Sequence, residues 1–299
     1  MNLKDELKKA SEGGYALGAF NFFDENSLKA IAHGAKNFPV IGAISQSSFD
    51  FIGETFLKAL VISSHKEFPN LFFHLDHGAN FEICKKCVDM GFDSVMIDAS
   101  SLPFLQNIAI TKSVVDYAHL KNVLVEAELG TLSGIEDLVS GEECFTKANQ
   151  AKEFVKKTNC DSLAVSIGTK HGAFKFAGTP TLRLDILEDI ENLIPNTPIV
   201  LHGSSSVNKK LLDAFRKSGG EIDNACGVPE NLLINAVKFH HVAKINVDTD
   251  LRICFTTALR EFFSNNKRNF CPRDSLRMAY WAIECSVWDK IKNVFGVCK

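Results

Sequence analysis

Short segments in which apolar and polar residues alternate recur along the chain, and longer stretches with helical periodicity separate them. Alternation over four to eight residues is typical of a β-strand, because neighbouring side chains point to opposite faces. We therefore predict eight strands, at residues 16–21, 40–45, 71–76, 94–98, 123–128, 162–167, 199–202 and 243–246. The intervening stretches predict amphipathic helices, for example at residues 25–36, 105–121, 148–158 and 209–218.

Eight strands that alternate with helices indicate an α/β protein with a closed (β/α)8 TIM barrel. An open, doubly wound sheet is the structural alternative. No linker rich in proline, serine or glycine divides the sequence, so we predict a single domain over residues 1–299. The barrel would occupy about residues 1–265, and a helical extension about residues 266–299.

The predicted strands carry polar residues at their carboxyl ends. Strict alternation places these residues on the inward face: Asn21, Ser45, Asp76, Asp98, Glu128, His202 and Asn246. Active sites of such barrels lie at this end, and a buried unpaired carboxylate is costly, so the ring predicts a metal or polar-ligand site. Glu126 and Glu128 would repel each other on one face, so we expect at least one of them to meet a cation or to be protonated.

Three histidines lie at or just past predicted strand ends, and glycine follows each of them. They are His77, His171 and His202. Three neutral imidazoles at one mouth are a typical ligand set for a catalytic zinc ion that keeps one position open. We expect the other histidines to be structural, with His74 packed in a lower layer of the barrel.

Composition narrows the classes of function. Thirty-three Lys and Arg residues against 36 Asp and Glu residues give a net charge of −3, which argues against a nucleic-acid partner. Apolar runs are too short to span a membrane, and the first residues lack the apolar region of a signal peptide. Nine scattered cysteines read as reduced thiols, so we expect a cytoplasmic protein. Cys84 and Cys87 would be packing residues of a helix rather than metal ligands.

Two stretches at the ends of the last two strands are suited to a phosphate group. They are residues 203–206 (Gly-Ser-Ser-Ser) and 246–249 (Asn-Val-Asp-Thr). Barrels of this class often bind phosphate there through backbone N–H groups and a helix start. Residues 130–145 are longer than an ordinary connection, and their glycines indicate a mobile lid. Glu136 on this segment either enters the site or is a solvated loop acid.

Taken together, these motifs resemble the class II, zinc-dependent fructose-bisphosphate aldolases, a family that includes the tagatose-bisphosphate enzymes. The resemblance covers about residues 1–265. The matching segments, in order, are Gly-Ala-Phe-Asn (18–21), His-Leu-Asp-His-Gly (74–78), Ser-Val-Met-Ile-Asp-Ala-Ser (94–100), Val-Glu-Ala-Glu-Leu-Gly (125–130), Gly-Thr-Lys-His-Gly (168–172), Leu-His-Gly-Ser-Ser (201–205) and Lys-Ile-Asn-Val-Asp-Thr-Asp (244–250).

The resemblance implies roles for individual residues. His77, His171 and His202 would bind the catalytic Zn²⁺, which would polarise the ketose carbonyl. Asp76 would be the base that takes the proton from the C4 hydroxyl. Glu136 would exchange the proton on dihydroxyacetone phosphate, and Asp98 with Glu128 would form a second, inner zinc site.

The same resemblance implies a sugar bisphosphate substrate, a monovalent cation (Na⁺ or K⁺) at the shared phosphate, and a homodimer. Arg252 would reach the second phosphate from the partner subunit. The substrate-binding residues implied are Asn21, Ser45, Gly172, Lys175, Gly203, Ser204, Ser205, Asn246, Val247, Asp248, Thr249 and Arg252. Ser206 departs from the glycine that is usual in the family, so a backbone that needs glycine there would be altered.

Three alternatives remain open at this point. The substrate could be tagatose 1,6-bisphosphate, the C4 epimer of fructose 1,6-bisphosphate. Lys244, which faces inward on the last strand, could act as a Schiff-base nucleophile without metal, although this leaves the three histidines unexplained. The chain could also be a non-catalytic descendant that binds a metal or a sugar phosphate.

Overall fold

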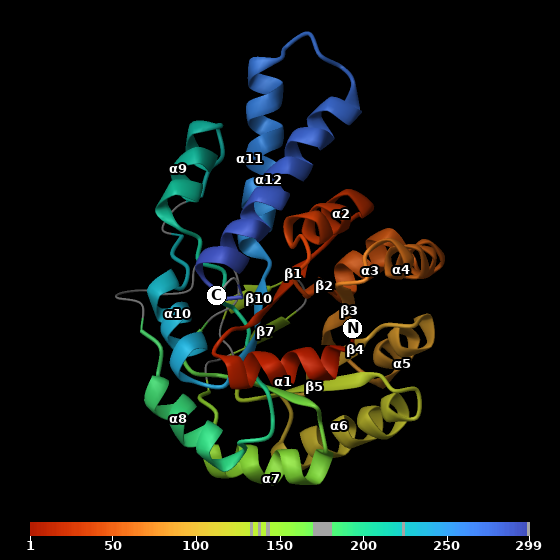
Figure 1. The fold of residues 1–299 in the computed structure, drawn as a ribbon, viewed down its shortest axis with the longest axis vertical. Coiled ribbons are helices and arrows are strands. Elements are labelled where there is room, and N and C mark those ends of the chain that lie inside the picture. The colour runs from red at the N-terminus through yellow and green to blue at the C-terminus, as the bar shows by residue number, and fades with distance from the viewer. Residues whose placement is uncertain (132–133, 137–138, 142–143, 170–180, 223–224, 298–299) are drawn as a thin grey trace.

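A computed structural model describes residues 1–131, 134–136, 139–141, 144–169, 181–222 and 225–297 of the chain. Within them, eight parallel strands close into a barrel in the order β1-β10-β9-β8-β5-β4-β3-β2 (Figure 1). The strands are β1 (Leu17–Asn21), β2 (Val40–Ile44), β3 (Leu71–Gly78), β4 (Ser94–Ile97), β5 (Leu124–Leu129), β8 (Ser162–Val165), β9 (Ile199–Leu201) and β10 (Val242–Val247). The barrel prediction is confirmed, and the open-sheet alternative is wrong because β1 pairs with both β2 and β10.

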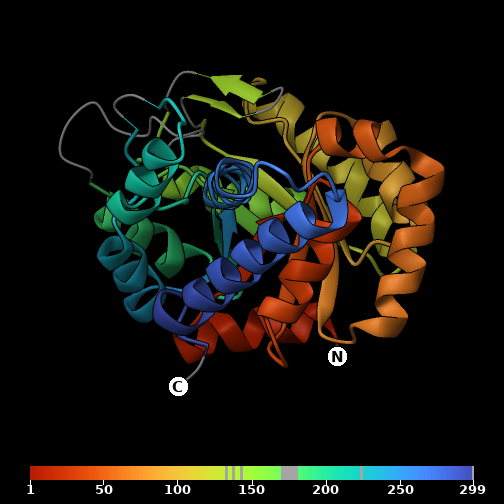
Figure 2. The same ribbon diagram turned by 90° about the horizontal axis from the view of Figure 1, so that it is seen from above.

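Helices surround this barrel and connect its strands (Figure 2). They are α1 (Leu3–Gly13), α2 (Glu25–Gly34), α3 (Gln46–Ile52), α4 (Glu54–Glu67), α5 (Phe81–Met90), α6 (Phe104–His119), α7 (Ala148–Thr158), α8 (Leu184–Leu193), α9 (Lys209–Lys217), α10 (Glu230–Phe239), α11 (Thr249–Asn265) and α12 (Pro272–Asn293). The prediction for α7 matches at both ends, and the other three named helices end one or two residues earlier than predicted. No helix in the described ranges is long and apolar enough to cross a membrane.

Helix α5 illustrates how the local sequence builds one of these connections. Asn80 caps its N-terminus by accepting hydrogen bonds from the backbone N–H groups of Glu82 and Ile83, and Gly91 ends it in a left-handed conformation. Cys84 and Cys87 lie on its buried face, and burial raises the pKa of the Cys84 thiol to about 12. The two cysteines are therefore packing residues, as predicted.

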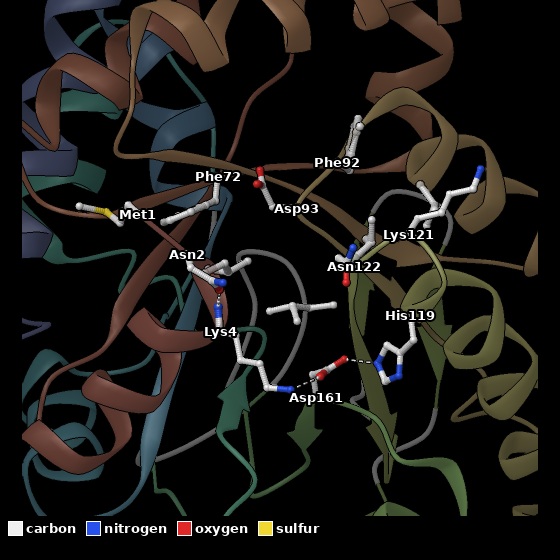
Figure 3. A pocket seen from close by; sticks show the side chains of 15 residues that line it. Met1, Asn2, Lys4, Phe72, Phe92, Asp93, His119, Lys121, Asn122 and Asp161 are labelled. Atoms are coloured by element: carbon white, nitrogen blue, oxygen red, sulfur yellow. Dashed lines mark hydrogen bonds and ion pairs between the residues drawn. The ribbon is translucent and has the colours of Figure 1, made fainter.

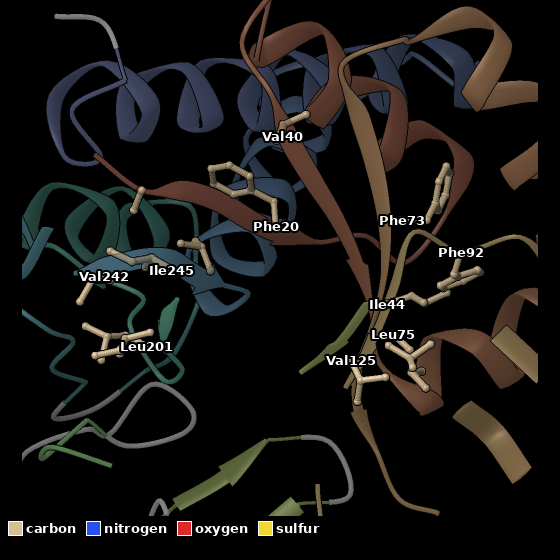
Figure 4. Close-up of a cluster of buried hydrophobic side chains, with 14 of the residues drawn as sticks. Phe20, Val40, Ile44, Phe73, Leu75, Phe92, Val125, Leu201, Val242 and Ile245 are labelled. Atoms are coloured by element: carbon tan, nitrogen blue, oxygen red, sulfur yellow. The ribbon is translucent and has the colours of Figure 1, made fainter. Parts of the chain in front are cut away.

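The main apolar core lies between the strands and the surrounding helices. Outward-facing strand residues such as Phe73, Leu75, Val125 and Ile245 are fully buried there (Figure 4). Phe73 packs edge-on against Phe22, with ring centroids 6.0 Å apart. The predicted alternation of facing is thus confirmed on the helix side.

A second, smaller core fills the interior of the barrel at its amino-terminal end. It contains strand residues Leu17, Ala19, Ile41, Ala43, Phe72 and Ala243, and helix α1 closes it with Leu3, Leu7 and Ala10. A pocket beside α1 opens at the same end, where Asp161 accepts hydrogen bonds from Lys4 and His119 (Figure 3). This end of the barrel is closed by apolar packing and bordered by surface ion pairs.

The segment after β5 contains structure that the sequence did not predict. Strands β6 (Gly134–Glu136) and β7 (Val139–Gly141) form an antiparallel pair that stands apart from the barrel (Figure 2). A bridge between Thr131 and Cys144 continues this pairing toward the barrel. The sequence indicates a lid over residues 130–145 but not these two strands, since a three-residue strand is too short to produce a readable alternation.

Candidate active site

Strand β3 ends in an irregularity that places two consecutive residues at the mouth of the barrel. Its pairing with β4 shifts register between Leu75 and Gly78. His77 adopts a left-handed conformation with φ of 47°, so its side chain departs from the alternation that directs Asp76 inward. A Cβ atom at position 78 would lie 2.5 Å from the carbonyl oxygen of Met96, so the bulge requires glycine there.

Asp76 is buried at the centre of the mouth and is held by two asparagine side chains. Asn21 Nδ2 donates to Oδ2 of Asp76 at 2.7 Å, and Asn246 Nδ2 donates to Oδ1 at 2.9 Å. These amides come from β1 and β10, the two strands that close the barrel. The Oδ1 atoms of both asparagines are buried without a partner among the described atoms, so they offer acceptors for hydroxyl groups beside the carboxylate.

His77 and His202 face each other beside Asp76, with Nε2 of His77 and Nδ1 of His202 only 3.0 Å apart. The far nitrogen of each ring contacts a carboxylate. Nδ1 of His77 lies 2.8 Å from Oδ2 of Asp98, and Nε2 of His202 lies 2.8 Å from Oε1 of Glu126. A carboxylate on one ring nitrogen holds the proton there and leaves the other nitrogen as a metal ligand.

This geometry fits a divalent metal ion. Ligand atoms of Asp76, His77 and His202 all lie within 4.8 Å of one another, as do those of a second group, His77, Asp98 and Glu128. Two nitrogens that bind one tetrahedral zinc ion, with Zn–N bonds of about 2.0–2.1 Å, lie about 3.3 Å apart. This is close to the 3.0 Å between Nε2 of His77 and Nδ1 of His202. Buried Oε2 of Glu128 has no hydrogen-bond partner among the described atoms, as expected of a carboxylate oxygen oriented toward a cation.

The charges around His77 shift the pKa values of the neighbouring groups. Burial works against a charged His77, but Asp76, Asp98 and Glu128 together raise its pKa well above the ordinary value. Burial likewise opposes a charged Asp98, yet His77 and Ser100 lower the pKa of this carboxyl. Burial and the nearby Asp98 charge raise the pKa of Glu128 well above that of an ordinary glutamate. These carboxylates are more numerous than the protein cations that reach them, which favours binding of a metal cation.

A buried ion pair lies directly beneath the histidines. Lys244 Nζ donates to both carboxylate oxygens of Glu126, at 2.8 and 2.9 Å, and lies 3.2 Å from Nε2 of His74. Burial alone would raise the pKa of Glu126, but Lys244 and His202 lower it. The expectation that at least one of the two glutamates meets a cation or is protonated is therefore met at Glu126, which pairs with Lys244. His74 lies in a lower layer, as predicted, with Nδ1 at 2.7 Å from Ser94 Oγ.

The two stretches predicted to bind phosphate lie side by side at the mouth. The backbone N–H of Asp248 donates to Ser205 Oγ at 3.2 Å, which joins the loop after β9 to the start of α11. Gly203 has a positive φ of 59°, a conformation that favours glycine. The φ of Ser206 does not lie in this left-handed region. Val207, with φ of 41°, carries the second left-handed turn, so serine at 206 does not by itself alter the backbone. Ser204, Ser205, Asn246, Val247 and Asp248 are all buried.

The remaining predicted residues are less fully described. Ser45 precedes α3 at the mouth, Thr249 begins α11, and Arg252 Nε donates to Asp248 of the same chain at 2.7 Å. The side chain of Val247 packs in the helix-side core, so only its backbone faces the mouth. His171, Gly172 and Lys175 lie outside the described residues. The backbone of Glu136 belongs to β6, but its side chain is outside the described part as well.

Two buried residues near the phosphate loop were missed in the sequence. Asp250 accepts hydrogen bonds from the backbone of Ser206 and Val207, and Lys290 contacts Ser206 from α12. Asp250 belongs to a matched segment and could have been found there. Lys290 follows Ile283 and Val287 at helical spacing on the buried face of α12, so periodicity was a signal for its burial, but this spacing does not show which partners the lysine meets.

The family model and the similar curated proteins indicate the same family for this chain. The family model "Fructose-bisphosphate aldolase class-II" matches residues 1–298. The chain is 38% identical over 320 residues to a fructose-bisphosphate aldolase of Treponema pallidum, an alignment that covers 99% of this chain and 96% of that protein. It is 41% identical over 301 residues to a fructose-bisphosphate aldolase of Giardia intestinalis, covering 98% and 92% of the two chains.

Solved structures agree with the sequence matches. The YdjI aldolase from Escherichia coli K12 superposes with a TM-score of 0.79 at 25% identity, covering 100% of this chain and 99% of that one. A fructose-bisphosphate aldolase from Campylobacter jejuni superposes with a TM-score of 0.73 over 98% of this chain and 93% of that one. At 20% identity, this second structure supports the barrel fold alone.

Proposed function

Because the chain belongs to the class II fructose-bisphosphate aldolase family and is a ketose-bisphosphate lyase, we propose that the site around Asp76 carries out its aldol reaction. Fructose 1,6-bisphosphate is cleaved to dihydroxyacetone phosphate and glyceraldehyde 3-phosphate, or formed from them. The observation that carries the assignment of residues is the pairing of His77 and His202 beside Asp76, each ring backed by a carboxylate.

In the proposed reaction, Asp76 takes the proton of the C4 hydroxyl. The C4 oxygen becomes the aldehyde carbonyl, the C3–C4 bond breaks, and its electrons remain on C3 of the dihydroxyacetone phosphate half. Asn21 and Asn246 keep the Asp76 carboxylate in place through amide donors on both oxygens, and their buried carbonyl oxygens are suited to accept substrate hydroxyls. Glu136 is proposed to return a proton to C3.

The family is metal-dependent, and the described residues supply a fitting donor set. We propose that His77, His202 and His171 hold a zinc ion and that Asp98 with Glu128 provides a second, inner position. A divalent ion bound there is a Lewis acid, which polarises the ketose carbonyl and offsets the negative charge that develops on cleavage. Glu126 orients His202, and Lys244 holds Glu126 in turn. This ion pair argues against Lys244 as a Schiff-base nucleophile.

Cleavage assays with fructose and tagatose 1,6-bisphosphates in parallel test this function. We expect turnover of fructose 1,6-bisphosphate by zinc-loaded protein, loss of turnover after treatment with a chelator, and recovery on adding zinc. Treatment with borohydride in the presence of substrate should trap no covalent adduct. Folded, zinc-bound protein that cleaves neither sugar would instead support the non-catalytic alternative, and an adduct on Lys244 would support the Schiff-base one.

A homodimer is also proposed, with the α11–α12 arm as its contact. This arm extends away from the barrel (Figure 1), and Phe263, Phe270 and Trp281 are 53%, 95% and 60% exposed on it. A second copy of the chain would cover these side chains, and Arg252 would then be available to a neighbouring site. Sedimentation of the parent protein and of Trp281→Asp tests this; a monomeric parent would contradict it.

A monovalent cation at the phosphate site and a cytoplasmic location are proposals from the sequence, testable by potassium titration and by cell fractionation.

A further inference from the structure

A buried lysine from the C-terminal helix lies directly behind the loop that follows β9. Lys290 Nζ donates to Ser206 Oγ at 2.7 Å and to Glu230 Oε1 at 2.7 Å, and it lies 3.2 Å from Oδ2 of Asp250. The Lys290 side chain is only 5% exposed. An ammonium group has three N–H donors, and these three acceptors from three different elements match them.

The Asp250 carboxylate fixes the backbone of this same loop. Its two oxygens accept hydrogen bonds from the N–H groups of Ser206, at 3.0 Å, and Val207, at 2.7 Å. Val207 has a left-handed φ of 41°, a conformation that a β-branched residue adopts only when its surroundings impose it. Gly227 packs against the other side, where a Cβ atom would lie 2.2 Å from the carbonyl carbon of Ser206. The loop is therefore held from both sides.

The position of Asp250 gives Lys290 a second role. A buried carboxylate directly behind a phosphate site would repel the dianionic phosphate of a substrate, unless a cation offsets its charge. Burial alone would lower the pKa of Lys290, but Asp250 and Glu230 raise it, so the ammonium group remains charged at neutral pH. Lys290 thus offsets the charge of Asp250, while the Asp250 carboxylate keeps the two hydrogen bonds that it accepts from the backbone of Ser206 and Val207.

From this geometry we infer that Lys290 is a positioning residue for the phosphate that fructose 1,6-bisphosphate shares with dihydroxyacetone phosphate. It acts through Ser206 and Asp250, which join the loop after β9 to the start of α11, and it need not touch the substrate. This inference rests on the proposed function of the site. It assigns a role in substrate binding to a helix that lies outside the barrel.

The test compares Lys290→Met with Lys292→Met, an exposed control on the same helix. We expect Lys290→Met to raise both the KM for fructose 1,6-bisphosphate and the dissociation constant of dihydroxyacetone phosphate, measured by calorimetry, about 10–100-fold. We expect kcat to change less than about threefold, since the groups at Asp76 are untouched. Lys290→Arg should restore part of the affinity, and Lys292→Met should match the parent.

A folded Lys290→Met protein with both constants within twofold of the parent would overturn the inference, as would a loss confined to kcat. Should Lys290→Met fail to fold, Ser206→Ala is the second variant, because it removes one acceptor and leaves no carboxylate without a cation. It should weaken binding of dihydroxyacetone phosphate about three- to tenfold, and unchanged binding would also refute the inference. The binding measurement separates the two proposals: a parent protein that binds dihydroxyacetone phosphate but does not cleave the bisphosphate contradicts the proposed function alone.

Discussion

The two ends of the barrel are built from the same eight strands but have opposite chemistry. At the amino-terminal end, small and aliphatic side chains from the strands pack against Leu3, Leu7 and Ala10 of α1. At the carboxyl end, the strands bury Asp76, Glu126 and Glu128, each 2% exposed. A domain can stabilise one end by hydrophobic burial and keep groups at the other end that are individually unfavourable for folding. Substitutions at the two ends should therefore separate stability from activity.

Replacing Asp76 should have the largest effect, and that effect should be confined to activity. Asp76→Asn keeps the shape of the side chain but removes the base, so kcat should fall about 10²–10⁴-fold. Urea-induced unfolding should show the same or slightly higher free energy of unfolding, because a buried charge is lost. Asp5→Asn, on an exposed position of α1, serves as the control. Turnover within tenfold of the parent would exclude Asp76 as the base.

Replacing Lys244, which lies between the two ends, should affect both properties. Lys244→Met leaves the buried Glu126 carboxylate without its cation and should lower the free energy of unfolding by about 3–5 kcal/mol. His202, which contacts Glu126, should also lose its fixed orientation, so kcat should fall. Urea unfolding and steady-state cleavage measure the two losses, and Lys238→Met provides an exposed control. If Lys244→Met has the same free energy of unfolding as the parent, the pair between Lys244 and Glu126 contributes little to stability.

At the amino-terminal end, Leu7→Ala should reduce stability without reducing activity. Leu7 is 5% exposed under the barrel, and loss of such a side chain costs about 2–5 kcal/mol. The KM and kcat measured well below the unfolding temperature should stay within twofold of the parent values. Exposed Lys8→Ala should change neither property. A kcat that falls together with stability would show that the two ends are coupled.

The smallest expected effect is the pH dependence of one pair at the amino-terminal end. The hydrogen bond that His65 Nε2 donates to Oδ2 of Asp93 raises the pKa of His65 above its ordinary value of 6.5. A raised pKa in the folded state stabilises the protein below pH 6.5, and the benefit disappears as the pH rises through the folded-state pKa. His65→Gln should therefore lower the free energy of unfolding more at pH 5.5 than at pH 8.5.

Since the His65 side chain is about one-third exposed, we expect the difference between the two pH values to be less than about 1 kcal/mol. Urea unfolding of the parent and His65→Gln at both values measures it. His241→Gln, at an exposed position, is the control. A larger cost at pH 8.5 than at pH 5.5 would reverse the sign and contradict the assigned pair.

The sequence predicted the barrel and the inward direction of several side chains at its mouth, because both depend on local periodicity. Alternation along β3 places Asp76 inward, and the glutamates of β5 and His202 after β9 follow in the same way. It did not predict the bulge that brings His77 beside Asp76, since a register shift depends on the neighbouring strand. Nor did it predict Lys290, whose partners Ser206 and Asp250 lie 84 and 40 residues away along the chain.

The closure of the barrel by β1 and β10 has a consequence for how the protein is made. Leu17 pairs with Lys244, so β1 has no neighbour on that side until almost the whole chain has left the ribosome. During synthesis this strand edge is open to pairing with other nascent chains, and contacts so distant in sequence form slowly. Helix α12, which carries Lys290, emerges later still. We therefore expect a truncated chain that ends before β10 to aggregate, and the phosphate loop to reach its final form last.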